Sequence, residues 1–93
     1  LDSIPRNLPA LVEAAQISSK AARAGFDWEN LDQVIAKLHE ELAELEHARA
    51  SRNAEAVEGE VGDLLFTLVN VARFAGADPE QALRKTNAKF RRR

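Results

Sequence analysis

The 93-residue sequence contains no cysteine, little glycine or proline, and no long apolar run. Without cysteine the chain has no disulfide framework and no thiolate ligand for a metal. This composition suits a reducing compartment, so we expect a cytoplasmic protein. No apolar stretch approaches the roughly 20 residues that cross a bilayer, which argues against a membrane protein. A chain of this length holds one small domain, and because it does not begin with Met we expect residues 1–93 to be a piece of a longer protein.

What remains is rich in Ala, Leu, Glu, Lys and Arg, the residues that favour helices. The sequence therefore predicts an all-α domain, with helices at about 9–24, 31–50, 54–75 and from 79 to the end. Gly25 and Gly76 stand where the first and third helices should end, and Asp78 and Pro79 stand where the fourth should begin. Short links favour antiparallel neighbours, so we expect a helix bundle.

The two central segments carry apolar residues at helical spacing. The expected packing stripe of residues 31–50 is Val34, Leu38, Leu42 and Leu45. That of residues 54–75 is Val61, Leu64, Leu65, Leu68, Ala72 and Ala75, widened by Phe66, Val69 and Val71. A helix that is apolar over most of its circumference is buried on most sides. In so short a chain this indicates that a second subunit covers it.

Acidic residues gather between positions 29 and 63, and basic residues gather from position 84 to the end. Within the acidic part, Glu41 and Glu44 are three residues apart, as are Glu60 and Asp63. This spacing places both carboxylates of a pair on one side of a helix. Either pair alone is typical of a solvated face. On a helical wheel, however, both pairs flank the apolar stripe, so antiparallel packing would bring four or five carboxylates, Glu40 included, to one rim.

Crowded carboxylates repel one another and resist ionisation unless a cation lies between them. An all-oxygen set without cysteine or converging histidine favours Mg²⁺, and Mn²⁺ after it. Gly62 lies inside the second acidic pair, where glycine costs about 1 kcal/mol relative to alanine. We therefore expect another backbone or a ligand to approach closely at Gly62.

The basic segment contains Lys85, Asn87, Lys89, Arg92 and Arg93, whose side chains suit phosphate oxygens. The alternative is an ordinary basic helix end, which the helix dipole also favours.

Four further side chains lie outside these motifs. Two of them have two possible roles each, and the other two are expected only to lie on the surface. Trp28 is the only tryptophan, and it either stacks on a nucleobase or closes the end of the bundle. A buried Asn70, near Arg73, either binds a substrate or satisfies a neighbouring helix. His39 and His47 share no motif and are expected on the surface.

The acidic pairs followed by Leu64-Leu65-Phe66, and the string Asn87-x-Lys89-Phe90-x-Arg92-Arg93, resemble the MazG-like all-α nucleoside triphosphate pyrophosphohydrolases. The resemblance covers nearly the whole chain. The segments Leu8-Pro9-Ala10-Leu11 and Gly25-Phe26-Asp27-Trp28 are similar to the second domain of two-domain MazG proteins.

The resemblance implies a four-helix bundle assembled as a homodimer, and Mg²⁺ held by four carboxylates: Glu41, Glu44, Glu60 and Asp63. Glu40 is implied as an outer ligand or as the group that orients the attacking water, and which carboxylate acts as base stays open between Glu40, Glu41 and the others. The residues implied for the phosphates are Lys89 and Arg93 with Asn87 and Arg92 nearby, and Trp28 is a weaker candidate for substrate binding.

The implied reaction is hydrolysis of a nucleoside triphosphate at the α-phosphorus, giving the monophosphate and pyrophosphate. The implied cellular role is house-cleaning of the nucleotide pool. One alternative is a catalytically weak helical dimerisation or regulatory module of a larger protein. Nucleic-acid binding through the arginines at the end is disfavoured by the acidic middle of the chain.

Overall fold

The structure, a computed structural model, describes residues 3–5 and 7–92, and over these residues it is helical with no strand. The helices are α1 (Ala10–Arg23), α2 (Leu31–Ala50), α3 (Ala54–Phe74) and α4 (Pro79–Arg91). The predicted all-α class is confirmed, and the boundaries lie close to those expected from the sequence. None of the described helices combines the length and the apolar character needed to cross a membrane.

Short polar side chains begin three of the helices. Asn30 accepts a hydrogen bond from the backbone N–H of Gln33, and Asn53 accepts one from that of Ala56. Asp78 does the same at the start of α4 for the two N–H groups that follow Pro79. These bonds satisfy donors that the first turn of a helix leaves free. Both asparagines directly precede a helical pattern, a signal that sequence reasoning missed.

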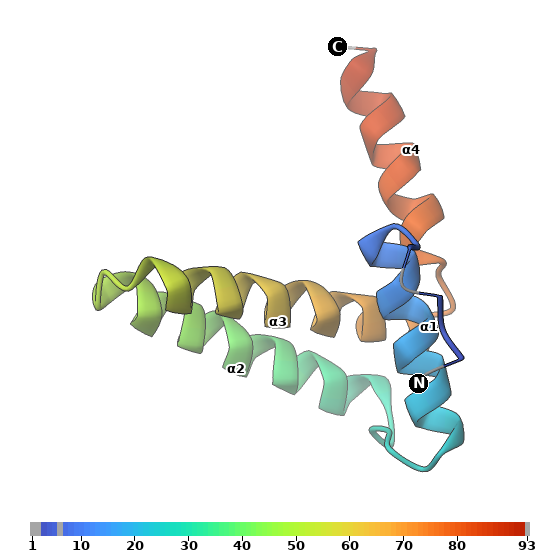
Figure 1. Ribbon diagram of the computed structural model, residues 1–93, viewed down its shortest axis with the longest axis horizontal. Helices are drawn as coiled ribbons and strands as arrows, with labels where there is room; N and C mark the ends of the chain where they lie inside the picture. The colour runs from blue at the N-terminus through green and yellow to red at the C-terminus, as the bar shows by residue number, and fades with distance from the viewer. Residues whose placement is uncertain (1–2, 6, 93) are drawn as a thin grey trace.

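The two long helices, α2 and α3, lie side by side and antiparallel, as a helical hairpin (Figure 1). Helix α1 crosses the hairpin at the end where α2 begins and α3 stops, and it packs against α3 and α4. Gly76, at φ +76°, lies in the turn after α3, and from there α4 leads away from the hairpin. The four helices therefore do not close into a bundle within one chain, contrary to what the short links suggested.

A narrow seam joins α2 to α3. The less exposed residues of both helices recur at alternating spacings of three and four, as in a coiled coil. They are Val34, Leu38, Glu41, Leu45 and Ala48 on α2, and Val57, Glu60, Leu64, Thr67 and Val71 on α3. Each helix thus places a glutamate where its partner helix packs. The expected stripe of α2 was wrong at one position, because Leu42 is 45% exposed and Glu41 takes its place in the seam.

The apolar stripe expected to pack α3 against its neighbour lies mostly on the surface. Val61, Leu65 and Leu68 are between 40% and 54% exposed, and Leu64 is the member of that stripe that enters the seam. Within one chain, the expected packing face of α3 is therefore not the one that α2 covers, and its burial by a second subunit stays a prediction. Helix α3 is apolar on two faces, and within one chain α2 covers only one of them.

A buried polar network stabilises the end of the hairpin that α1 crosses, where α2 begins and α3 stops. Asn70 is 1% exposed; its Oδ1 accepts hydrogen bonds from Ser18 and Arg73, and its Nδ2 donates to the carbonyl of Phe66 at 3.1 Å. Arg73 also donates to Ser18 at 2.9 Å and to both carboxylate oxygens of Asp27 at 2.6 and 3.0 Å. The Arg73 guanidinium lowers the pKa of Asp27. Of the two roles considered for Asn70, the structure shows the structural one.

Replacing Asn70 with alanine should lower the free energy of unfolding by about 1–3 kcal/mol, because Ser18 and Arg73 would lose a buried acceptor. Chemical denaturation at fixed protein concentration measures the change. Gln16→Ala, at an exposed position of α1, is the control and should change the free energy of unfolding by less than about 0.5 kcal/mol. Equal effects of the two substitutions would contradict a stabilising role for the network.

Candidate metal site

Three carboxylates meet at the seam between α2 and α3. Glu41, Glu60 and Asp63 each place one oxygen within 4.8 Å of the oxygens of the other two. Glu41 comes from α2, and the other two come from one side of α3, three residues apart. The antiparallel register of the hairpin brings Glu41 to this pair, although Glu41 lies about 20 residues earlier in the sequence.

Glu41 is the most buried member of this acidic cluster, at 4% exposed. Its Oε1 forms an ion pair with the ammonium of Lys37 at 3.2 Å, one turn earlier on α2. Its Oε2 is buried and has no hydrogen-bond partner among the described residues, and the same is true of Oε2 of Glu60. Buried carboxylate oxygens without partners are energetically costly, so the seam contains two acceptors that something else must satisfy.

The electrostatics extend the cluster to Glu44. The pKa of Glu60 is raised, first by desolvation, then by the charge of Glu44 and a hydrogen bond with it, and then by the charges of Glu41 and Asp63. Four carboxylates therefore act on one another across the seam. Glu40 is exposed on α2, and its negative charge contributes to raising the pKa of Lys37, after the larger effect of Glu41.

These residues fit a divalent cation. The donors are all carboxylate oxygens, which suit hard ions such as Mg²⁺ and Mn²⁺. Lys37 is paired with a single oxygen of Glu41, so its ammonium leaves the two unpartnered oxygens unsatisfied. An ion between α2 and α3 would satisfy both oxygens and offset the repulsion that raises the pKa of Glu60.

The residues expected to bind phosphate do not lie beside these carboxylates in one chain. Asn87, Lys89 and Arg92 are exposed along α4, which leads away from the hairpin (Figure 1). Arg93 lies outside the described residues. Among the described helices, α4 packs against α1 and α3 and not against α2.

Trp28 is half-buried in the loop before α2. Its backbone N–H donates to the Asp27 carboxylate at 3.0 Å, and Arg73 holds that carboxylate in turn. At 1.5 Å rise per residue, the start of α2 is roughly 15 Å from Glu41 along the helix axis. Within one chain Trp28 is therefore remote from the acidic cluster.

Gly62 has no close neighbour. A Cβ atom placed there would have no atom of the described chain within 4 Å, apart from its chain neighbours and its own helix backbone. The expected close approach of another backbone is therefore wrong for a single chain. Gly62 is exposed, so the surface beside the acidic pair is open.

A groove of about 440 Å³ adjoins the cluster toward the turn between α2 and α3. Glu44 and Glu60 line it together with His47, Ser51 and Asn53. His47 was expected to be plain surface and is exposed, but it faces this groove. Its position three residues after Glu44 is the signal in the sequence that could have placed it near the acidic motif.

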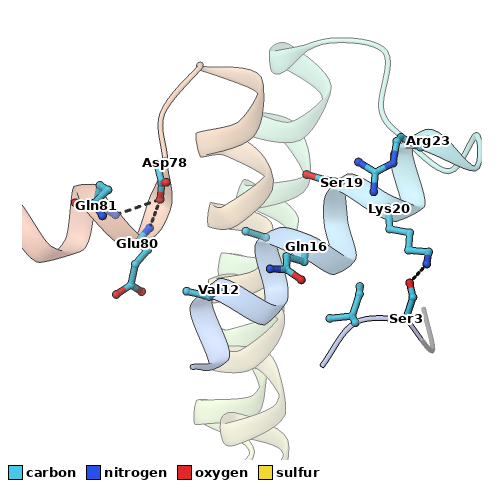
Figure 2. A pocket seen from close by; sticks show the side chains of 11 residues that line it. Ser3, Val12, Gln16, Ser19, Lys20, Arg23, Asp78, Glu80 and Gln81 are labelled. Carbon is cyan, nitrogen blue, oxygen red and sulfur yellow. Dashed lines mark hydrogen bonds between the residues drawn. The ribbon is translucent and has the colours of Figure 1, made fainter. Parts of the chain in front are cut away.

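A second cavity, of about 590 Å³, lies elsewhere, between α1 and the start of α4 (Figure 2). Gln16, Lys20 and Arg23 line it from α1, and Asp78 and Glu80 line it from the other side. None of the clustered carboxylates borders it. Cavity size therefore does not identify the site, and the converging carboxylates do.

The fold and the cluster define an all-α protein with a candidate divalent-cation site on a helical hairpin. Residues 29–93 match the family model described as the MazG nucleotide pyrophosphohydrolase domain, and the chain belongs to this family. The match includes all four clustered carboxylates and the basic segment.

Curated relatives agree with this assignment. The chain is 47% identical, over its whole length, to a nucleoside triphosphate pyrophosphohydrolase of Escherichia coli K12, of which it covers 36%. It is 47% identical over 89% of its length to the nucleoside triphosphate pyrophosphohydrolase/pyrophosphatase MazG of Thermotoga maritima, of which it covers 31%. It is also 48% identical to the uncharacterized protein YabN of Bacillus subtilis. The chain spans about a third of the length of the first two relatives.

Replacing Glu60 with glutamine should stabilise the metal-free protein at neutral pH. The folded-state pKa of Glu60 is raised above its ordinary value of 4.5, so the charged form is disfavoured in the folded state. The resulting loss of stability is absent below the unfolded pKa and complete above the folded pKa. The difference between the variant and the wild type should therefore grow as pH rises from about 4 to neutrality.

Thermal melts in a chelator, across this pH range, measure the difference. Glu58→Gln, at an exposed position of the same helix, is the control for removing one negative charge. A wild-type protein that is as stable as the Glu60 variant at neutral pH would contradict the repulsion inferred for the cluster.

Proposed function

We propose that this domain hydrolyses nucleoside triphosphates to monophosphates and pyrophosphate, the activity for which its relatives are named, and that it uses Mg²⁺ to do so. The observation that carries the proposal is the pair of buried, unpartnered carboxylate oxygens of Glu41 and Glu60 in the hairpin seam. A helix pair built only for packing would place apolar side chains at these positions.

In this proposal Glu41, Glu44, Glu60 and Asp63 hold Mg²⁺, and Mn²⁺ can replace it. When bound, the ion neutralises phosphate charge and makes a nearby water more acidic. Glu40 is exposed beside Glu41 on α2, and we assign it to orienting the attacking water. The substrate's phosphates carry the negative charge that Lys89, Asn87, Arg92 and Arg93 would hold, and these groups would stabilise the departing pyrophosphate.

The basic residues and the carboxylates are separated within one chain, so we propose that two chains share the site. Helix α4 of one protomer would lie against the hairpin of the other. The exposed apolar face supports this, since Leu65 and Leu68 of α3 and Leu83 of α4 line an apolar groove of about 320 Å³. A homodimer covering this face would bury the stripe and close the four-helix bundle that one chain leaves open.

Trp28 completes the proposal as a substrate contact. Its indole is half-buried rather than sealed in the core, so part of it remains free to stack on a base. Because Trp28 is remote from the Glu41 of its own chain, that contact also requires a second protomer.

A panel of nucleoside triphosphates incubated with Mg²⁺ should yield monophosphate and pyrophosphate, identified by ion-exchange chromatography. Glu41→Gln should remain folded and lose at least ~100-fold in turnover, because the cation would lose its buried ligand. Glu46→Gln is the matched control on α2, since Glu46 pairs with Arg49 on the surface.

The assay is run on this chain and on the full-length protein. Release of diphosphate and orthophosphate would contradict the reaction. A dimerisation module without catalysis would release no product from either protein and would show no saturable Mg²⁺ binding by calorimetry.

Mixing two inactive variants tests the shared site. If the carboxylates of one protomer act with Lys89 of the other, a heterodimer of Glu41→Gln and Lys89→Met retains one intact site of two. Random mixing should then restore about a quarter of wild-type activity, because half of the dimers are heterodimers. The two variants are denatured and refolded together, and each is refolded alone as a control. Absence of recovery in a mixture that forms dimers would place both groups in the same chain.

A further inference from the structure

Lys37 forms an ion pair unlike the others in the described part of the chain. Its partner Glu41 has a side chain that is 5% exposed, whereas the carboxylates paired with Arg49, Arg73 and Arg84 are at least 25% exposed. The Lys37 side chain itself is 38% exposed. A flexible amine at the edge of the seam therefore reaches a carboxylate inside it.

The surroundings of Lys37 are strongly negative. Glu40, Glu41 and Glu44 lie near it on α2, and Glu60 and Asp63 join Glu41 from α3. Among the described residues, the Lys37 ammonium is the cation that forms an ion pair with this cluster. It occupies Oε1 of Glu41 and leaves Oε2 without a partner, so its neutralisation of the cluster is incomplete.

We propose that Lys37 is a tethered counter-cation that substitutes for the divalent ion in the metal-free protein and competes with it for Glu41. This inference rests on the metal site of the proposed function. A lysine side chain is long, mobile and half-exposed here, so its ammonium can move into water when a more highly charged ion binds. The same positive charge repels the incoming ion and lowers the affinity for it. Lys37 thereby stabilises the empty hairpin and limits how tightly the cluster holds Mg²⁺.

Lys37→Met tests the proposal because methionine keeps most of the side-chain volume and removes the charge. Calorimetric titration of the full chain with Mg²⁺ at low salt should show tighter binding than wild type by at least about threefold. The gain should shrink as salt is added, because it is electrostatic. The metal-free variant should melt at a lower temperature than metal-free wild type, and Mg²⁺ should raise its melting temperature by more.

Two variants serve as matched controls. Lys37→Arg keeps the charge and should bind Mg²⁺ with wild-type affinity. Arg84→Met removes the cation of another ion pair of the same i,i+4 spacing, with Glu80 on α4, and should leave Mg²⁺ affinity unchanged. Lys37→Gln, which is also neutral, should reproduce the tighter binding of Lys37→Met and replaces it if the methionine variant does not fold.

Unchanged or weaker Mg²⁺ binding by the neutral variants would overturn the role given to Lys37. In that case a wild type that still binds Mg²⁺ and hydrolyses its substrate would leave the proposed function standing. A wild type with no saturable Mg²⁺ binding would instead overturn the metal site, and the role of Lys37 with it.

Discussion

Burial of the Glu41 carboxylate between α2 and α3 is the constraint on which the rest of this structure depends. The helices pack through a seam with the spacing of a coiled coil, and a leucine at this position would contribute about 1.5–3 kcal/mol by its burial. Glutamate gives up that contribution and adds the desolvation of a charge. The arrangement becomes favourable only when cations lie beside it. Lys37 supplies one cation from within the chain, and the remaining unpartnered oxygens could accept another.

The hairpin contains two groups of polar side chains that differ in whether their hydrogen-bonding atoms have protein partners. Asn70 is hydrogen-bonded to Ser18, Arg73 and the carbonyl of Phe66, and this network ties α1 to α3 and, through Arg73, to the loop before α2. Such a network makes the packing specific and needs no ligand. Around Glu41 and Glu60 the acceptors outnumber the donors. A buried amide with protein partners therefore holds the fold together at one end of the hairpin, whereas the carboxylates along its middle leave two oxygens that a ligand could satisfy.

The apolar stripe of α3 remains exposed in a single chain. A chain of this size can bury only a limited part of its apolar surface, and α3 is apolar on two faces. Helix α2 covers the face that carries the glutamate and leaves the more apolar face with Val61, Leu65 and Leu68 on the surface. Helix α4 leads away and carries the basic residues with it. A second copy of the chain would cover the exposed stripe and would also bring basic residues to the carboxylates.

The sequence by itself determined the helices and their limits, because propensity, capping side chains and glycine after a helix act within a few residues. It also determined that Glu41 and Glu44, and Glu60 and Asp63, form pairs on one side of a helix, since that follows from spacing alone. It also placed Lys37 one helical turn from Glu41, because residues four apart are neighbours on a helix.

Only the tertiary structure decided which face of each helix packs. Helix α3 offers two apolar faces, and a helical wheel favours the more apolar one, whereas the face that packs depends on contacts with α2 and α1. The burial of Glu41, the exposure of Leu42 and the open surface at Gly62 all follow from that choice. The direction of α4, and with it the separation of the basic residues from the carboxylates, depends on the turn after α3 and on packing against α1, which no local pattern records.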